Sequence, residues 1–176
     1  MNINIRQEKE SDYKKTEAVV EKSFKNAEHT DHKEHFLVSK LRKSNVFIPE
    51  LSLVAEVNEK IIGHIMFTKL QIDNGKNKYE SLALAPVSIL PEYQNKGIGS
   101  SLVMEGLRIA KKAGFKSVIV LGHDKYYPRF GFKPASNFGI KAPFDVPDIA
   151  FMDLELYGKA LNDVTGTVIY GKEFLE

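Results

Sequence analysis

The sequence contains no cysteine. The protein therefore cannot form a disulfide, use a thiolate in catalysis or bind zinc through sulfur ligands. It also has no apolar run that is long enough to cross a membrane. The first residues, Met1–Arg6, enter an alternating strand pattern at once, without the apolar centre of a signal peptide. These absences predict a cytoplasmic protein with no membrane partner.

A strong excess of charge of one sign is absent as well. The chain has 25 basic and 23 acidic residues and a net charge of +2, which does not fit a general nucleic-acid binder. With 176 residues, 43% of them hydrophobic, it is long enough to bury a core. Because no linker, repeat or low-complexity segment interrupts it, we expect residues 1–176 to form a single domain.

The most informative stretch runs from Leu82 to Leu102. Leu82–Leu90 is an apolar run suited to a buried strand, Pro91–Lys96 is a polar turn, and an amphipathic helix is predicted from Gly97 onward. The apolar face of this helix consists of Ile98, Leu102, Val103, Gly106, Leu107 and Ala110, and the polar face includes Ser101, Glu105, Arg108 and Lys112.

The turn between this strand and this helix has the features of an anion site. Backbone N–H groups at a helix N-terminus have no partners inside the helix, and the helix dipole adds partial positive charge there. Gly97 and Gly99 have no Cβ, so a phosphate group can approach the backbone closely, and Lys96 adds a full charge. The turn is therefore a candidate site for a pyrophosphate.

Three known phosphate-binding turns can be compared with this stretch. A P-loop places its lysine after a glycine, whereas here the lysine comes first. A dinucleotide-binding turn has a third glycine where this chain has Leu102, and an acidic residue after the next strand, where Val118–Leu121 is wholly apolar. The pattern Q/R-x-x-G-x-G/A is met by Gln94, Gly97 and Gly99, and it resembles the acyl-CoA pyrophosphate turn of the GNAT N-acetyltransferases. A tight strand-to-helix turn without a ligand is the alternative.

Hydrophobic periodicity and turn residues predict alternating helices and strands along the whole chain. Two helices are expected before the central stretch, from Ser11 or Asp12 to about Phe24, with Tyr13, Val20 and Phe24 inward, and from about Asp31 to Lys43, with Phe36, Leu37 and Leu41 inward. Strands are expected at Ile3–Ile5, Leu51–Val57, Ile61–Ile72, Val118–Leu121, from Phe132, Phe151–Tyr157 and Thr167–Tyr170, besides the central one. Turns are expected at Asn58–Lys60 and Asn74–Asn77, a helix C-cap at Gly114, a short helix or turn at Asp124–Phe130, and a loop at Pro134–Pro147. This order indicates a mixed sheet with helices on both faces.

Pro86 lies inside the central apolar run, where a strand normally excludes proline because proline has no N–H to donate. Either the strand starts after Pro86, or the proline interrupts the pairing. We favour an interruption, because the glycine turn follows at once. It would leave the backbone N–H groups of Val87, Ser88 and Ile89 free.

The second informative stretch is Asp124–Phe132. Tyrosines here can simply be half-buried packing residues, as most tyrosines are. Tyr127, however, stands four residues before Gly131–Phe132. This spacing resembles the GNAT pattern Y-x-x-x-G-F, in which the tyrosine hydroxyl lies near the sulfur of CoA.

The resemblance to the GNAT N-acetyltransferases extends over nearly the whole chain and is strongest to their bacterial YhbS-type branch. It rests on the glycine turn, on the tyrosine motif and on further matching segments, which are Pro49–Ala55, Gly63–His64, Val120–His123, Tyr126–Phe132 and Val164–Tyr170. It implies an α/β (α+β) fold with a mixed sheet of about six or seven strands, splayed at its centre, and helices on both faces.

The resemblance also implies a role for individual residues. Acetyl-CoA would lie in the splay, where backbone groups of Val87, Ser88 and Ile89 would hold the pantetheine and the acetyl carbonyl. The pyrophosphate would be held by the turn, which consists of Gln94, Asn95, Lys96, Gly97, Ile98, Gly99 and Ser100. Tyr127 would be the general acid. Many members carry a cofactor-binding asparagine seven residues before this tyrosine, where this chain has Val120 instead.

The general base that removes a proton from the attacking amine is left open. His123, His64, Glu80 and Glu34 are candidates by region, and His123 in the tyrosine loop is counted as a catalytic candidate.

His29, His32 and His35 form an i, i+3, i+6 series. Their spacing drifts around a helix and no acidic partner is evident, so we expect an exposed face or the rim of an acceptor site, and no metal.

The sequence therefore predicts an acetyl-CoA-dependent N-acetyltransferase that transfers the acetyl group directly in a ternary complex, since no cysteine is present to carry it. A sensor or interaction module that binds acyl-CoA without chemistry is the alternative, and a nucleotide-binding domain is a third. The expected partner is a small-molecule or peptide amine, in a monomer or homodimer. A small amine, an antibiotic, a peptide N-terminus and a protein lysine all remain open as acceptors.

Overall fold

The computed structural model describes residues 1–28 and 30–175. These residues divide into two compact units, each made of two chain segments. Unit 1 contains Met1–Thr68 and Ala85–Ile109, and unit 2 contains Lys69–Leu84 and Ala110–Glu176. No helix of the described residues is long and apolar enough to span a bilayer.

Within the described residues one mixed sheet has nine strands, which follow the order β1-β2-β3-β4-β5-β8-β6, with β9 pairing with β3 and β7. The strands are β1 (Asn4–Gln7), β2 (Phe47–Val57), β3 (Lys60–Asp73), β4 (Lys78–Ile89), β5 (Ser117–Leu121), β6 (Lys133–Pro134), β7 (Ile140–Lys141), β8 (Phe151–Glu155) and β9 (Gly166–Ile169). The β4–β5 and β7–β9 pairs are parallel. The mixed sheet is confirmed. Its strand number exceeds the expected six or seven because two-residue strands, β6 and β7, add to the longer ones, and β7 forms inside the predicted loop.

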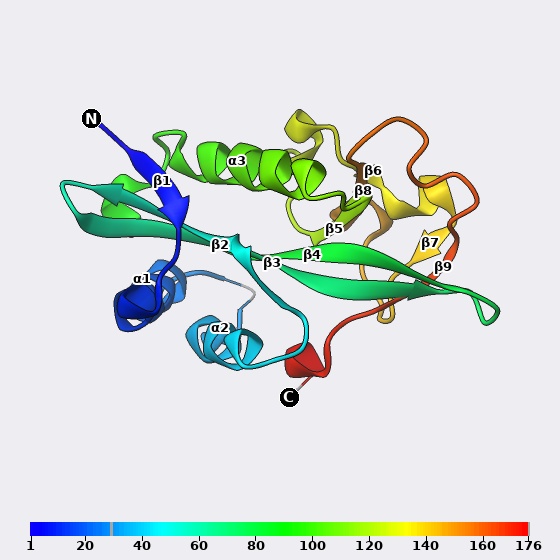
Figure 1. Ribbon diagram of the computed structural model, residues 1–176, viewed down its shortest axis with the longest axis horizontal. Helices are drawn as coiled ribbons and strands as arrows, with labels where there is room; N and C mark the ends of the chain where they lie inside the picture. Colours follow the sequence, from blue (N-terminus) through cyan, green and yellow to red (C-terminus); the bar gives the residue numbers. More distant parts are fainter. Residues whose placement is uncertain (29, 176) are drawn as a thin grey trace. The chain divides into compact units, whose positions relative to one another are not determined.

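In the described part of the chain, three α-helices accompany the sheet: α1 (Tyr13–Phe24), α2 (Glu34–Arg42) and α3 (Ile98–Lys112). In unit 1, α1 and α2 lie on one face of β2 and β3, and the first part of α3 lies on the other face (Figure 1). Short 3-10 helices lie at Glu10–Asp12, Pro91–Tyr93, Tyr127–Phe130, Ala135–Phe138, Asp148–Ala150 and Lys172–Leu175. The expectation of helices on both faces is confirmed.

Helix α3 packs closely on β3 because two glycines remove side chains from the contact. A Cβ on Gly106 would overlap the ring of Phe67, and a Cβ on Gly63 would lie 3.3 Å from a methyl group of Leu102. Apart from the partly buried Leu107, the predicted apolar face of α3 is buried, as expected from its periodicity. The helix also ends as predicted. Gly114 has φ +92°, its N–H donates to the Lys111 carbonyl, and the next N–H donates to the Ala110 carbonyl, which is a Schellman motif.

The second helix differs from the prediction in its start and its orientation. It begins at Glu34 rather than near Asp31, because the side chains of Thr30 and Asp31 accept hydrogen bonds from the N–H groups of His32 and Lys33 and form turns there. Val38 and Leu41 are buried, but Phe36 is 59% exposed. The prediction that Phe36 faces inward was therefore wrong.

Two strands begin earlier than their sequence patterns indicated. Strand β4 starts at Lys78 and continues through Pro86, so a strand that starts after Pro86 is excluded. Strand β2 starts at Phe47 and includes Pro49, at a register shift between Phe47 and Ser52 that relieves this position of regular pairing.

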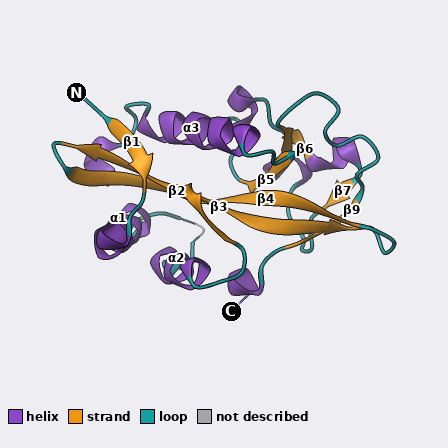
Figure 2. Cartoon of the chain, viewed as in Figure 1, coloured by secondary structure: helices purple, strands orange, loops and turns teal. Residues whose placement is uncertain are grey.

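Unit 2 has its own core, to which its strands and the loops between them contribute. Figure 2 shows how these strands and loops are arranged. Its buried residues are Leu70, Ile72, Ala83, Ile119, Ala135, Ile140, Phe151, Leu161 and Val168. Strand β5 pairs with β4 at Leu82 and Ala83, and with β8 along its whole length. This core holds the strand from which the loop with His123 and Tyr127 emerges.

Candidate functional site

The turn that precedes α3 is open to solvent and is shaped by a glycine. Residues 94–97 are exposed, whereas Ile98, the first residue of α3, is buried. Gly97 has φ +80°, a conformation that favours glycine, and apart from its two chain neighbours no atom of the described residues lies within 4 Å of the position where its Cβ would be. The N–H of Ser101 donates to the Gly97 carbonyl, and the N–H groups of Ile98 and Gly99 precede this first bond of the helix, so an anion could reach them.

Gln94 connects this turn to the end of β4. Its side-chain Nε2 donates to the carbonyl of Ile89 over 2.9 Å. The side chain therefore holds the turn against the strand, and this contact gives the first residue of the Q-x-x-G-x-G pattern a role within the protein. Asn95 has φ +63°, which an asparagine tolerates better than most residues.

Two lysines flank an aromatic ring beside the turn. The Nζ atoms of Lys60 and Lys96 both lie 5.7 Å from the centre of the Tyr93 ring. Lys60 also lies 3.9 Å from a carboxylate oxygen of Glu92. Lys96 therefore places a positive charge next to the exposed turn, whereas the charge of Lys60 is partly offset by Glu92.

The end of β4 carries a buried hydroxyl group. Ser88 is 2% exposed, and its Oγ has no hydrogen-bond partner within the described residues. On the neighbouring strand, a Cβ at Gly63 would lie 2.7 Å from the Ile89 side chain and 3.1 Å from the Ser88 carbonyl. Gly63 thus allows β3 and β4 to pack closely at the segment expected to hold the acyl group.

Tyr127 is held by aromatic packing. It begins the 3-10 helix Tyr127–Phe130, which ends at Gly131 with φ +101°. Its ring lies edge-on to Tyr126 at 5.0 Å and to Phe132 at 5.7 Å between ring centres. Burial, with a contribution from Tyr126, raises the pKa of the Tyr127 hydroxyl to about 12, so the group is protonated at neutral pH.

A glycine makes room for this tyrosine. A Cβ on Gly122 would overlap the Tyr127 ring, so a glycine directly after β5 is needed for the tyrosine to pack there. His123 itself is exposed, with 71% of its side chain accessible. Its Nδ1 accepts the N–H of Lys125 over 3.2 Å and lies 3.6 Å from Asp124.

The other candidates for the general base lie in separate environments. Glu34 on α2 accepts a hydrogen bond from Thr30. Glu80 lies near the start of β4, at a pocket of about 300 Å³ in unit 2. His64 is fully buried within unit 1.

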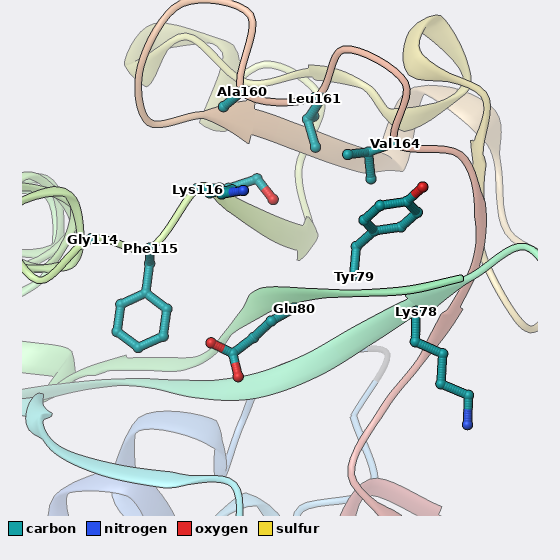
Figure 3. Close-up of a pocket in the computed structure, with 10 residues that line it drawn as sticks. Lys78, Tyr79, Glu80, Gly114, Phe115, Lys116, Ala160, Leu161 and Val164 are labelled. Carbon is teal, nitrogen blue, oxygen red and sulfur yellow. The ribbon is translucent and has the colours of Figure 1, made fainter. Parts of the chain in front are cut away.

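The pocket at Glu80 is built from the first residues of β4, the segment before β5 and the loop after β8 (Figure 3). The Tyr79 ring points towards Val164, and Leu161 lies beside it, whereas the Glu80 carboxylate points to the side of Phe115 (Figure 3). Val87–Ile89 stand at the other end of β4, so this pocket does not coincide with the expected acyl segment.

The histidine series does not lie on one helix. His32 stands in the turn before α2 with φ +58°, and its Nδ1 lies 2.7 Å from the Phe24 carbonyl. His35 is on α2 and its Nε2 lies 2.9 Å from Glu21, while His29 lies outside the described residues. Within the described part of the chain no group of three or more potential ligands is placed to hold a metal.

A buried polar network in unit 1 escaped sequence reasoning. Ser52 on β2 donates to Glu8 over 2.8 Å and lies 3.0 Å from Nε2 of His64. Arg42 on α2 binds the same Glu8 carboxylate through two nitrogens, at 2.6 and 3.3 Å. These residues are far apart in the sequence. Of these residues only His64 was predicted to take part in the site, as a candidate base, and no local pattern links it to Glu8, Ser52 or Arg42.

Comparison with known proteins places this site in a family. The profile described as the Acetyltransferase (GNAT) family matches residues 8–132, which include the glycine turn and the tyrosine motif. The chain belongs to the GNAT acetyltransferase family. The resemblance found in the sequence is therefore confirmed.

Individual GNAT relatives support the same assignment. Over 117 residues the chain is 38% identical to the uncharacterized N-acetyltransferase YjhQ of Escherichia coli (strain K12), covering 66% of this chain and 65% of YjhQ. It thus spans slightly less than two thirds of YjhQ. The crystal structure of the GNAT protein YhbS from Escherichia coli in complex with CoA matches with a TM-score of 0.90 and 29% identity, over 100% of this chain and 93% of that one. A GNAT acetyltransferase from Brucella melitensis in complex with acetyl-CoA matches with a TM-score of 0.81 and 32% identity, over 98% of each chain.

Proposed function

We propose that this GNAT protein is an acetyl-CoA-dependent N-acetyltransferase. The observation that carries the proposal is the exposed glycine turn between β4 and α3, with its left-handed Gly97 and open space above it. This turn occurs in a chain that is similar over nearly its whole length to GNAT structures that contain CoA or acetyl-CoA. The residues present fit the diphosphate of such a co-substrate by their charge and by the close approach they allow.

In this proposal the turn of Gln94–Ser100 holds the pyrophosphate through backbone N–H groups, with Lys96 adding charge. Val87–Ile89 hold the pantetheine and the acetyl carbonyl, and a free N–H of this segment stabilises the oxyanion that forms when the amine attacks. Tyr127 donates its proton to the sulfur of the departing CoA. The raised pKa of this tyrosine fits that role, because a general acid must be protonated before the step.

The surroundings of the two histidine candidates, His64 and His123, argue against either ring as the general base. His64 is enclosed by protein and Glu8, and burial lowers its pKa to about 4 despite the opposing effect of that carboxylate. His123 is exposed, but its Nδ1 already accepts the backbone N–H of Lys125, so this nitrogen is occupied in the structure and does not point a free lone pair at an amine. A water molecule that passes the amine proton to bulk solvent fits these environments better than either ring.

Direct transfer to a small-molecule or peptide amine, in a monomer or homodimer, is part of the same proposal. The test is a panel of amines in which free CoA is measured at a fixed concentration of acetyl-CoA. CoA release that depends on one class of amine would support the enzyme. Binding of acetyl-CoA without release for any amine would favour a sensor of the same fold, and nucleotide binding without acetyl-CoA binding would favour the third candidate.

A further inference from the structure

A buried chain of polar side chains crosses unit 1 from the surface to the sheet. It begins at Glu17 on α1, whose carboxylate lies 2.7 Å from Nη1 of Arg42. Arg42, with 4% of its side chain exposed, lies over the Tyr13 ring and binds Glu8 at 2.6 Å. Glu8, with 1% exposed, accepts from Ser52, and the Ser52 oxygen lies 3.0 Å from His64.

The hydrogen-bond donors in this chain fix the tautomer of His64. Burial alone would raise the pKa of Glu8, but the hydrogen bonds and the charge of Arg42, bound at 2.6 Å, hold it below its ordinary value. Glu8 is therefore a carboxylate and can only accept. The single hydroxyl proton of Ser52 goes to Glu8, so the Ser52 oxygen must accept from Nε2–H of His64. A neutral ring has one N–H, and Nδ1 of His64 is consequently a bare lone pair.

This lone pair has an unsatisfied neighbour on the adjacent strand. Nδ1 of His64 is buried without a partner within the described residues, and so is Oγ of Ser88. The N–H of Leu90, the residue after β4, donates to the carbonyl of Ile62 on β3 over 2.9 Å. In the hairpin turn the N–H of Asn74 donates to the carbonyl of Asn77, a register that differs by one residue, so the pairing of β3 and β4 shifts between the two ends. Counted from the nearer pair, Leu90 and Ile62, Ser88 stands opposite His64. Opposite residues point to the same face of a sheet.

We propose that His64 is a positioning residue for the acyl-binding segment, and that its bare Nδ1 accepts the hydroxyl proton of Ser88. The Glu8–Ser52–His64 relay then fixes the side chain of Ser88 and, through it, the backbone of Val87–Ile89. This inference rests on the proposed function only in assigning that segment to the acyl group. The proposed hydrogen bond would satisfy both Nδ1 of His64 and Oγ of Ser88. Each of these buried atoms otherwise carries the energetic cost of an unmade hydrogen bond.

The relay is tested first without reference to activity. Nitrogen-15 NMR of labelled histidine distinguishes a bare ring nitrogen from a protonated one, and His64→Gln identifies the signals of this residue among the five histidines. We expect the Nε2–H tautomer in the wild-type protein, a shift of the Nδ1 signal in Ser88→Ala, and loss of the fixed tautomer in Ser52→Ala. Thr68→Val is the matched control, because Thr68 is on the same strand, buried, and also carries an unpartnered hydroxyl. It should leave the His64 signals unchanged.

A proton on Nδ1 of the neutral wild-type ring would overturn the proposal. So would an Nδ1 signal that Ser88→Ala leaves unchanged, or one that Thr68→Val shifts as much as Ser88→Ala does. These outcomes can be read from wild-type and folded variants, whose stability is followed by thermal melting. None of them depends on whether acetyl-CoA binds.

The functional part is tested by separating turnover from affinity. Ser88→Ala and His64→Gln should each lower turnover about three- to tenfold, the effect of one buried hydrogen bond, while the affinity for acetyl-CoA changes less than about twofold. The double variant should be no worse than the single ones, because both remove the same contact. Additive losses, or equal losses in Thr68→Val, would show that His64 contributes only general stability. Failure to bind acetyl-CoA would instead refute the proposed function and leave the NMR result standing.

Discussion

Tyr127 illustrates how the site depends on the surroundings of a single residue. Its ring is enclosed by Gly122, Tyr126 and Phe132, and this burial keeps its hydroxyl protonated far above neutral pH. The motif spacing alone indicated which tyrosine to choose. The packing gives a physical reason for this choice, because burial raises the pKa of a phenol and an exposed phenol has no such rise.

Replacing Tyr127 by phenylalanine keeps the ring and removes only the proton donor. If the hydroxyl protonates the leaving thiolate, the contribution belongs to the transition state, so turnover should fall about 10²-fold. The affinity for acetyl-CoA should change little. Turnover and acetyl-CoA binding are measured for this variant and for Tyr126→Phe, which retains the adjacent ring and should be milder. A larger loss in Tyr126→Phe would assign the donor to that residue instead.

Asp12 provides a residue-scale prediction about pH. Two hydrogen bonds from Arg6, at 2.8 and 3.1 Å, lower the pKa of Asp12 below its ordinary value of 3.8, in spite of its burial. A carboxyl with a lowered folded-state pKa stabilises the fold at pH above the unfolded value, and this contribution is lost as the pH falls through the folded value. The free energy of unfolding should therefore decrease below about pH 4.

Asp12→Asn should remove about 1–2 kcal/mol at neutral pH and flatten this acid dependence, as measured by urea unfolding at several pH values. Glu105→Gln is the control, because Glu105 pairs with Arg108 on the exposed side of α3. Such a surface pair contributes little, so this variant should stay within about 0.5 kcal/mol. Equal effects of the two variants would contradict the role given to Asp12.

At the scale of elements, the turn between β4 and α3 is the part of the site that sequence and structure describe most consistently. The strand ends, Gln94 ties the turn to Ile89, and α3 begins at Ile98. This leaves residues 94–97 exposed at the positive end of a fifteen-residue helix. The turn therefore gives the sharpest test of where the pyrophosphate lies.

Gly97→Val should lower the affinity for acetyl-CoA by at least about tenfold, because a branched side chain blocks close approach of a phosphate. Lys96→Ala should cost less, since it leaves the backbone groups in place. Gly75→Val is a matched control: Gly75 also has positive φ, +89°, and open space around its Cβ position, but it lies in the β3–β4 hairpin turn. Both valine variants carry the same backbone strain. If both bind acetyl-CoA equally well, the pyrophosphate does not lie at Gly97.

The elements themselves show what a sequence can predict. Helix α3 could be predicted because its apolar residues recur every three or four positions between a glycine turn and a glycine cap. The start of helix α2 was predicted too early because Thr30 and Asp31 make side-chain hydrogen bonds before it, which periodicity does not reveal. The buried face of the helix is centred on Val38 and Leu41, and this leaves Phe36 exposed on the other side.

The candidate site could be predicted only in part for a similar reason. Its glycine turn and its tyrosine are local motifs, with all their residues close together in the chain. The relay joins residues 44 and 12 positions apart, Glu8 with Ser52 and Ser52 with His64. No local pattern indicates such a contact, because pairing of distant strands creates it.

At the scale of the whole molecule, the two units share strands β3 and β4, and the proposed chemistry draws on both units. The glycine turn and Ser88 belong to unit 1, and Tyr127 belongs to unit 2. The proposal assigns these residues to one reaction because the chain belongs to the GNAT family and is similar to whole GNAT chains that hold CoA or acetyl-CoA. The central claim is therefore that acetyl-CoA binds to the intact chain.

Thermal melting of the intact protein with increasing acetyl-CoA tests this claim most directly. A ligand that binds only the folded state stabilises it by mass action, by about 2.7 kcal/mol at a hundredfold excess over Kd. The account predicts a melting temperature that rises with acetyl-CoA and nearly as much with desulfo-CoA, because most contacts go to the pyrophosphate and the pantetheine. A folded protein whose melting temperature does not change at millimolar acetyl-CoA would contradict the account.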